Sequence, residues 1–132
     1  MERTAKHFRK RDAILSCLRQ TTEHPSADWV YAKLKPEIPD LALGTVYRNL
    51  ALFKDQGLIA SLGTVGGVER FDGNTAPHVH FICTRCSGVT DLPQIYVPQS
   101  LCSRAAAETG GQVDTCSLTF TGTCSRCNSN QQ

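Results

Sequence analysis

The sequence predicts an α+β protein in two parts, an N-terminal winged helix-turn-helix domain and a smaller C-terminal α+β domain. Three observations support this. The first half shows helical apolar spacing interrupted by proline-marked turns, a glycine-rich bend follows between two apolar runs, and the second half carries two Cys-x-x-Cys pairs. At 132 residues, neither part would be stabilised comfortably by its own core, so a structural metal or a dimer would help.

Three helices are expected in the first half. The first contains Ile14 and Leu18 and ends before Pro25. The second spans 27–34, and Ser26 is well placed as its N-cap. The third starts at Leu43. Its apolar residues recur at three- and four-residue steps, at Leu43, Val46, Leu50 and Phe53. Gly57 suits the C-cap that ends this helix. Its other faces are expected to carry Thr45, Arg48, Asn49 and Lys54.

A β-hairpin is expected after the third helix, with residues 58–62 and 68–71 flanking a bend at 63–67. Two short helices separated by a turn and followed by such a hairpin make a winged helix-turn-helix. Turn-forming residues then mark a domain boundary. The predicted division is a winged-helix domain at 1–72, a connecting loop at 73–77 and a metal-binding domain at 78–132.

The second half is expected to alternate strands and one helix. Strands are predicted at 79–82, around 89–92 and at 113–122, with a helix at roughly 98–109 that ends at Gly110. If 79–82 is a strand, His78 and His80 lie on the same face. Residues 128–132 are expected to form a frayed tail.

Net charge and cysteine content limit the class of protein. The net charge is only +2, but residues 1–62 carry ten Lys/Arg against seven Asp/Glu, whereas residues 63–132 carry four against five. The first residues do not form an apolar signal region and no run is long enough to span a membrane, so we expect a cytoplasmic protein without a membrane partner. In that compartment paired cysteines are more often metal ligands than cystines.

Four cysteines have the spacing of a zinc site, C-x2-C-x37-C-x2-C: Cys83, Cys86, Cys124, Cys127. Zn²⁺ favours four thiolates in a tetrahedron, and a two-residue spacer lets one turn place both sulfurs on the same ion. The alternative, two independent redox pairs, is weaker because neither pair opens a helix after a thioredoxin-like strand. We therefore expect a structural Zn²⁺.

A second set of ligands lies beside the cysteines. His78 and His80 flank one residue and are bracketed by Asp72 and Asp91, so two nitrogens and two oxygens can converge. Such a set without thiolate suits Fe²⁺, Mn²⁺ or Zn²⁺ at five or six coordination. The alternative is that these are surface histidines beside the zinc site.

These features together resemble the ferric uptake regulator family of metal-dependent bacterial repressors. The resemblance covers nearly all of the chain and rests on the following stretches: 24–28 (HPSAD), 44–50 (GTVYRNL), 57–59 (GLI), 70–72 (RFD), H-x-H-x-x-C-x-x-C at 78–86 and the terminal C-x-x-C. It implies that 1–72 is the DNA-binding domain, 73–77 a hinge and 78–132 the dimerisation domain. It also implies a homodimer that binds palindromic DNA operators when its regulatory site holds metal, with the four cysteines on structural zinc. It also implies a regulator rather than an enzyme, with no catalytic residues.

Within the family, the peroxide-sensing repressors are the most similar branch. The resemblance implies a regulatory Fe²⁺ or Mn²⁺ site built from His24, Asp72, His78, His80 and Asp91. It further implies that bound Fe²⁺ reacts with hydrogen peroxide, the one small molecule expected as a signal, and that His24 or His78 is oxidised. The iron-uptake branch usually has Glu at the place of Asp91, whereas Arg48 is the choice typical of iron regulators. A ferric or zinc uptake regulator is therefore the alternative.

The third helix is expected to contact DNA. Arg48 can bind a guanine edge with two hydrogen bonds and Tyr47 can contact a thymine methyl, whereas Thr45, Lys54 and the basic residues from Lys6 to Arg11 suit phosphates. A solvated helix face is the alternative for the phosphate set. A zinc hydrolase or deaminase is disfavoured, because no glutamate follows His78 or His80 at the deaminase spacing. A zinc-ribbon interaction module would leave the helix-turn-helix unexplained.

Overall fold

The computed structural model describes the backbone of residues 2–76 and 78–129, and within those ranges the side chains from Arg9 onward. The chain forms two compact units, Met1–Thr75 and Ala76–Gln132. Part of the predicted hinge (Pro77), part of the predicted tail (130–132) and the side chain of Lys6 lie outside the described residues. The assignment of DNA-binding, hinge and dimerisation roles to 1–72, 73–77 and 78–132 stays a prediction.

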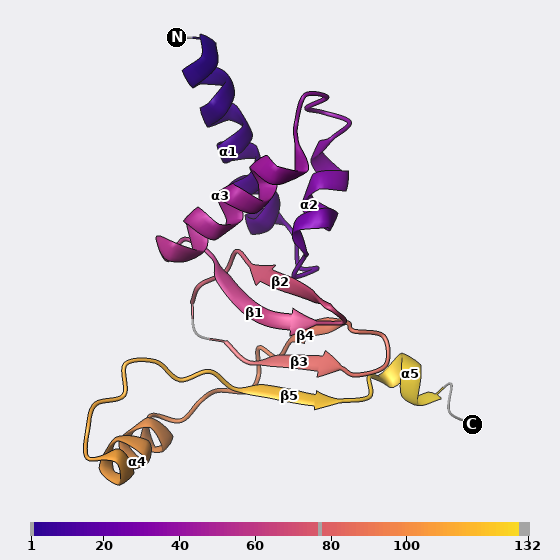
Figure 1. Cartoon of the computed structure of the whole chain (residues 1–132). Coiled ribbons are helices and arrows are strands. Elements are labelled where there is room, and N and C mark those ends of the chain that lie inside the picture. The colour runs from indigo at the N-terminus through magenta and orange to yellow at the C-terminus, as the bar shows by residue number, and fades with distance from the viewer. Residues whose placement is uncertain (1, 77, 130–132) are drawn as a thin grey trace. The chain divides into compact units, whose positions relative to one another are not determined.

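Unit 1 is a winged helix-turn-helix, as predicted. Helices α1 (Glu2–Gln20), α2 (Ala27–Leu34) and α3 (Leu43–Asp55) are followed by the antiparallel strands β1 (Ala60–Val65) and β2 (Val68–Asp72) (Figure 1). Ser26 caps α2 as expected, because its Oγ accepts a hydrogen bond from the backbone N–H of Trp29 at 3.2 Å. Helix α3 ends at Asp55 with Gln56 as its C-cap, and the next residue, Gly57, has the left-handed φ of 75° that favours glycine after a helix.

The core of unit 1 is formed by the apolar faces of the three helices, by Ile38, Leu41 and Ile59 from the connecting segments, and by Phe71 from β2. Its fully buried members include Ile14, Leu18, Val30, Leu41, Val46, Leu50 and Phe53. Two residues of α3 differ from the expectation. Leu43 is 37% exposed, because it is the first residue of the helix, and Asn49 is buried, with its amide donating to the Thr45 carbonyl one turn earlier at 2.8 Å. A side-chain amide can be buried there because the helix backbone accepts its hydrogen bond.

The hairpin is tighter than the sequence predicted. Residues 63–65 belong to β1, and Val65 pairs directly with Val68, so only Gly66 and Gly67 form the turn. Both glycines have positive φ, of 65° and 86°, as a two-residue turn of this hand requires. The extra glycine, Gly63, lies at a register shift within the strand pair.

Unit 2 is a small α+β unit around a mixed sheet with the order β4-β3-β5. Strand β3 (His80–Cys83) pairs antiparallel with β4 (Val89–Asp91) and parallel with β5 (Thr119–Gly122). Helix α4 (Gln99–Thr109) lies between β4 and β5 in the sequence and ends at Gly110, whose φ is 70°.

Two predictions for unit 2 were wrong. The last strand begins at Thr119 rather than near Val113, because it pairs only along the four residues of β3. The second cysteine pair was expected to open no helix, yet Cys124 directly precedes the short helix α5 (Ser125–Ser129), and Asn128 N–H donates to the Cys124 carbonyl at 2.8 Å. A five-residue helix leaves too few turns for apolar periodicity to reveal it.

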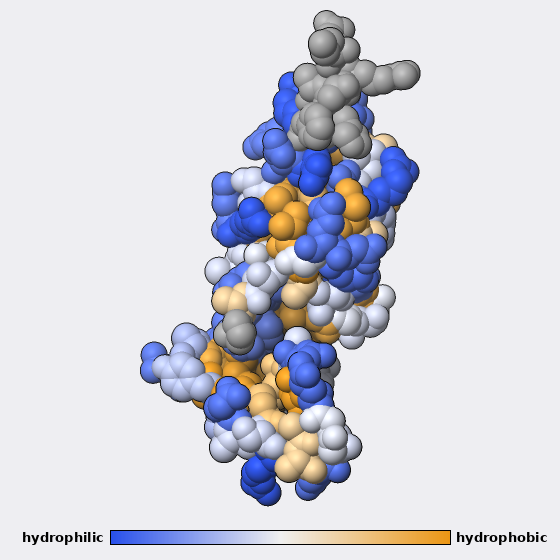
Figure 2. All heavy atoms as spheres, turned by 90° about the vertical axis from the view of Figure 1, so that its left-hand side faces the viewer, coloured by the Kyte–Doolittle hydropathy of each residue, from blue (hydrophilic) through white to orange (hydrophobic). Residues whose placement is uncertain are grey.

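The surface of unit 2 is rich in exposed apolar side chains. No described residue of α4 is buried, and Leu101 on this helix is 43% exposed. Ile95, Tyr96 and Phe120 are also exposed, by 42%, 77% and 42%. Figure 2 views the protein from the left-hand side of Figure 1, where α4 lies, and shows apolar patches in orange among the polar residues of this face. In the part of the chain that the structure describes, none of the helices is long and apolar enough to cross a membrane.

Candidate functional site

The four predicted cysteine ligands lie together in unit 2. Their sulfur atoms are all within 4.8 Å of one another, and Cys86 Sγ lies 3.9 Å from Cys124 Sγ. A tetrahedron with Zn–S bonds of 2.3 Å has sulfurs about 3.8 Å apart, so the cluster has the size that a four-thiolate zinc site needs. The parallel pairing of β3 and β5 explains the meeting, because it places Gly122 opposite Cys83 and therefore Cys124 two residues beyond.

Backbone N–H groups in the cluster point at sulfur. Cys83 Sγ accepts from the N–H of Cys124 at 3.4 Å and from that of Cys86 at 3.5 Å, and these hydrogen bonds lower the pKa of the Cys83 thiol to about 6. The pKa of Cys127 is instead raised to about 12, first by its hydrogen bond with Cys124. Hydrogen bonds, first from the Cys127 backbone, also lower the pKa of Cys124, so thiolate forms readily at these two cysteines while Cys127 resists further negative charge, a situation that a bound dication relieves. The donor set fits zinc.

Two of the predicted regulatory ligands lie in unit 1. His24 is only 3% exposed and Asp72 only 7%, and Nε2 of His24 lies 3.5 Å from Oδ2 of Asp72. Asp72 is the last residue of β2, and its Oδ1 accepts the backbone N–H of Asn74 at 2.9 Å. That hydrogen bond orients the carboxylate, so the imidazole and one carboxylate oxygen face each other in a buried place.

The other three predicted ligands lie in unit 2. Nε2 of His78 and Nε2 of His80 each lie 3.4 Å from Oδ1 of Asp91, and the two imidazole centroids are 4.3 Å apart. The β3–β4 register explains this, because it pairs His80 directly with Asp91. Strand β3 starts only at His80, so His78 reaches Asp91 from the segment before the strand rather than by strand alternation.

The tautomer of His78 suits a ligand. Nδ1 of His78 lies 2.6 Å from the Ala76 carbonyl oxygen. A carbonyl can only accept, so Nδ1 carries the proton and Nε2 presents its lone pair on the side of Asp91. Two imidazole nitrogens close to one carboxylate oxygen require a proton or a cation among them. The donor set, two nitrogens and an oxygen without thiolate, fits Fe²⁺, Mn²⁺ or Zn²⁺.

The predicted DNA-contact residues of unit 1 differ in how much their side chains contact other parts of the protein. Tyr47 is 51% exposed on α3, and Arg48 beside it donates to Thr45 Oγ1 at 3.2 Å. Lys54 forms a 3.2 Å ion pair with Glu69 of β2. The guanidinium of Arg11 lies over the ring of the core residue Phe53, 5.7 Å from its centroid. Tyr47 and Arg48 are therefore the most available of these side chains for a base edge.

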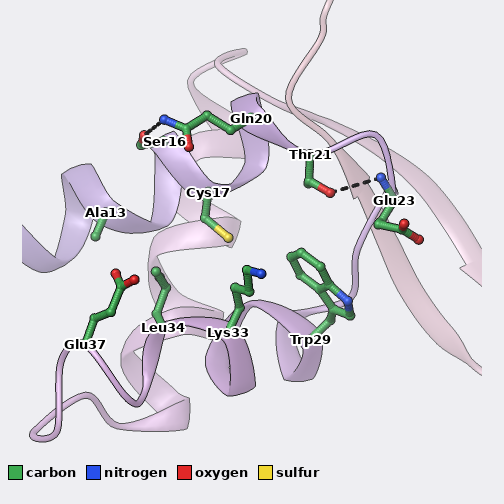
Figure 3. Close-up of a pocket in the computed structure, with 10 residues that line it drawn as sticks. All are labelled: Ala13, Ser16, Cys17, Gln20, Thr21, Glu23, Trp29, Lys33, Leu34 and Glu37. Carbon is green, nitrogen blue, oxygen red and sulfur yellow. Dashed lines mark hydrogen bonds between the residues drawn. The ribbon is translucent and has the colours of Figure 1, made fainter.

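A hollow of about 600 Å³ in unit 1 lies between α1 and α2 (Figure 3). Its lining includes Cys17, Trp29, Lys33 and Glu37, and it contains none of the predicted ligands or DNA contacts. Burial raises the pKa of the Cys17 thiol, so this cysteine is held in its less reactive protonated form. We assign no chemistry to the hollow.

Sequence reasoning assigned no role to two residues that contact the predicted ligands. Asn74 binds the Asp72 carboxylate, and the Asp-x-Asn pattern, which often forms such a turn, could have indicated it. Arg70 donates to the backbone carbonyls of Glu23 and His24. Because those partners precede it by 47 and 46 residues, no local pattern could have revealed the contact.

Comparisons with known proteins find chains with a similar sequence and fold. The chain is 40% identical over 88 residues to the peroxide-responsive repressor PerR of Staphylococcus aureus, a match that covers 65% of this chain and 60% of that protein. Its fold is similar to the crystal structure of the Campylobacter jejuni peroxide stress regulator, with a TM-score of 0.79 at 27% identity over 96% of this chain and 94% of that one.

It is also similar to the iron-bound ferric uptake regulator of Francisella tularensis, with a TM-score of 0.74 at 26% identity over 89% and 90% of the two chains. The model of the ferric uptake regulator family matches residues 2–121, which include both histidines of the H-x-H motif and the first cysteine pair. The chain therefore belongs to the ferric uptake regulator family.

Proposed function

We propose that the protein is a metal-dependent DNA-binding transcriptional repressor, rather than an enzyme, and that it acts in the cytoplasm as a homodimer on palindromic operators. Membership of the family supports a regulator. The exposed Tyr47 and Arg48 on α3 supply groups that can read base edges in a major groove. The exposed apolar side chains on and around α4, such as Leu101 and Tyr96, supply the surface for a second copy.

We further propose that Cys83, Cys86, Cys124 and Cys127 hold a structural Zn²⁺. The mutual distances of the sulfurs support this, and so does the small sheet of unit 2, which has few buried apolar side chains among its described residues. In such a small unit, the binding free energy of zinc contributes directly to folding.

The regulatory ion is proposed to be Fe²⁺ or Mn²⁺. The observation that carries this proposal is the close approach of His78 and His80 to the one carboxylate oxygen of Asp91, in a group that excludes thiolate. We propose that the same ion also takes His24 and Asp72 as ligands, which supply a second nitrogen and oxygen pair from unit 1. Imidazole and carboxylate ligands without sulfur favour these metals over a closed zinc structure.

An ion with ligands in both units would stabilise one arrangement of them, and a dimer in that arrangement could place both α3 helices in successive major grooves. Shifting the equilibrium between this arrangement and the others from 1:99 to 99:1 requires that the metal bind this arrangement about 5.5 kcal/mol more tightly. Several additional ligands can supply that difference. Loss of one ligand would weaken the preference and release the operator.

The proposed signal is hydrogen peroxide. Fe²⁺ bound in this site would supply the electron that activates peroxide, and His24 or His78 would be the side chain oxidised. The identity to a peroxide-responsive repressor and the presence of aspartate at position 91 support this branch. Mn²⁺ would support operator binding without sensitivity to peroxide.

The test is a DNA-shift titration with the protein loaded with Fe²⁺ or Mn²⁺, before and after peroxide. We expect peroxide to abolish binding by the Fe²⁺ form only, with mass spectrometry showing oxygen added to His24 or His78. The variant His24→Ala should keep its fold and its structural zinc but show weaker metal-dependent DNA binding. An unaltered metal response in this variant would remove His24 from the site.

A regulator of metal availability is the second candidate. Arg48, which resembles the iron-regulator choice in α3, favours it, and the similarity to the F. tularensis ferric uptake regulator is compatible with it. Operator binding with Fe²⁺ that survives peroxide unchanged would select this function instead.

A further inference from the structure

His24 has an unusual backbone conformation. Its φ is 52°, in the left-handed region that residues with a Cβ adopt only at a cost, yet its side chain is almost completely buried. Residues held in this region persist when the surrounding structure determines their conformation, and they often lie at functional sites. Contacts from the surrounding structure must therefore hold the backbone of residue 24.

His24 lies in the loop between α1 and α2. Two consecutive residues of β2 donate hydrogen bonds to three consecutive carbonyl groups of this loop, those of residues 23–25. Nε of Arg70 donates to the His24 carbonyl, and Nη2 of Arg70 donates to the Glu23 carbonyl at 2.8 Å. The next N–H along the strand, that of Phe71, donates to the Pro25 carbonyl at 2.9 Å. The residue after that is Asp72, whose carboxylate meets the imidazole of His24.

The guanidinium group is well suited to this task. Its donors lie in a rigid plane, so a single half-buried side chain can serve two adjacent carbonyls at once, whereas a lysine ammonium is a single flexible point of charge. Arg70 is not expected to be a metal ligand itself, because a guanidinium group offers hydrogen-bond donors and no acceptor. Its contacts act on the backbone that carries the ligand.

We propose that Arg70 is a positioning residue for the regulatory site. It holds residues 23 and 24 in the conformation that directs the His24 imidazole at Asp72, so that the unit 1 ligands are arranged before a metal binds. This inference rests on the proposed function of His24 and Asp72 as ligands. Partners that orient a metal ligand typically affect metal affinity by about 10- to 100-fold.

The experiment compares Mn²⁺ affinity in the full-length zinc-loaded protein with Arg70→Ala, Arg70→Lys and the control Glu69→Gln. Glu69 precedes Arg70 on β2, and its side chain contacts Lys54 and Ser61 rather than the His24 loop. Free Mn²⁺ is measured by electron paramagnetic resonance. Absorption of the Co²⁺-loaded protein reports the ligand geometry, and fluorescence of Trp29, the only tryptophan in the sequence, reports unfolding of unit 1.

We expect the Mn²⁺ dissociation constant to rise about 10- to 100-fold in Arg70→Ala and by a smaller factor in Arg70→Lys, with an altered Co²⁺ spectrum in both. Glu69→Gln should match the parent protein in Mn²⁺ affinity and in the Co²⁺ spectrum. A role in stability alone would lower the unfolding midpoint but leave Mn²⁺ affinity and the Co²⁺ spectrum unchanged, and this result would overturn the proposal. If Arg70→Ala does not fold, Arg70→Lys decides by the same two measurements.

His24→Ala, titrated in parallel, separates this inference from the proposed function. Parent-like Mn²⁺ affinity in His24→Ala would show that His24 is not a ligand, and both proposals would fall. Weakened binding in His24→Ala together with parent-like binding in the Arg70 variants would overturn only the positioning role.

Discussion

Replacing Gly73 by alanine should destabilise unit 1. Gly73 follows β2, and a Cβ on it would lie 2.6 Å from the carbonyl oxygen of Leu18, 2.8 Å from the carbonyl carbon of Leu18 and 2.9 Å from the amide nitrogen of Arg19. The first distance is roughly 0.8 Å short of the 3.4 Å at which ordinary van der Waals contact begins. All three atoms belong to the backbone of α1, so no side chain can rotate to make room.

The cost follows from this overlap. Either the end of α1 or the segment after β2 must move, and such overpacking typically costs about 1–3 kcal/mol. For a unit of 75 residues, each kcal/mol lowers Tm by about 4–8 °C. The displaced segment begins directly after Asp72, so the substitution should also weaken binding of the proposed regulatory metal.

The assay is urea unfolding followed by Trp29 fluorescence, which reports only on unit 1 because the sequence contains no other tryptophan. The matched control is Gly44→Ala near the start of α3, where the added Cβ meets only Arg48 Nη1, at 3.2 Å, and Arg48 Cζ, at 4.0 Å, on a flexible side chain. The control should be neutral or stabilised by up to about 1 kcal/mol, since alanine favours helix more than glycine does. An unchanged unfolding midpoint in Gly73→Ala would refute the close approach to α1.

Three further outcomes are expected. Cys124→Ser should lose zinc and the proposed dimer together, measured as metal content per chain and by sedimentation. The control Cys102→Ser should keep its zinc. Full zinc content in Cys124→Ser would contradict the ligand assignment. Glu69 should titrate below 4.5 in a carbon-detected NMR titration, because hydrogen bonds, first from Ser61, lower its pKa. Its ionised form then stabilises the fold above that pH, this contribution disappears as the pH falls through the lowered pKa, and Ser61→Ala should raise the pKa again. Arg48→Ala should remove about 1–3 kcal/mol of preference for one guanine in the operator, and equal weakening on every duplex would instead indicate a phosphate contact.

Local features of the fold were largely predictable from the sequence. Ser26 caps α2 and Gly110 ends α4, since caps depend on a few neighbouring residues. The winged helix-turn-helix followed from apolar periodicity and from the glycines of the hairpin. The burial of Asn49 could not be read in the same way, because a polar residue on a helix can satisfy its hydrogen bonds on its own backbone.

The sequence by itself determined which residues have the chemistry of ligands and how they pair locally. Cys83 and Cys86 share one turn because two residues separate them, and the same holds for Cys124 and Cys127. Only the tertiary structure decided which distant groups meet. Pairing of β5 with β3 brings the second cysteine pair to the first across 37 residues, and the packing of β2 against the loop before α2 brings Arg70 to His24. Such contacts depend on strand register and on the path of the whole chain, which no local spacing specifies.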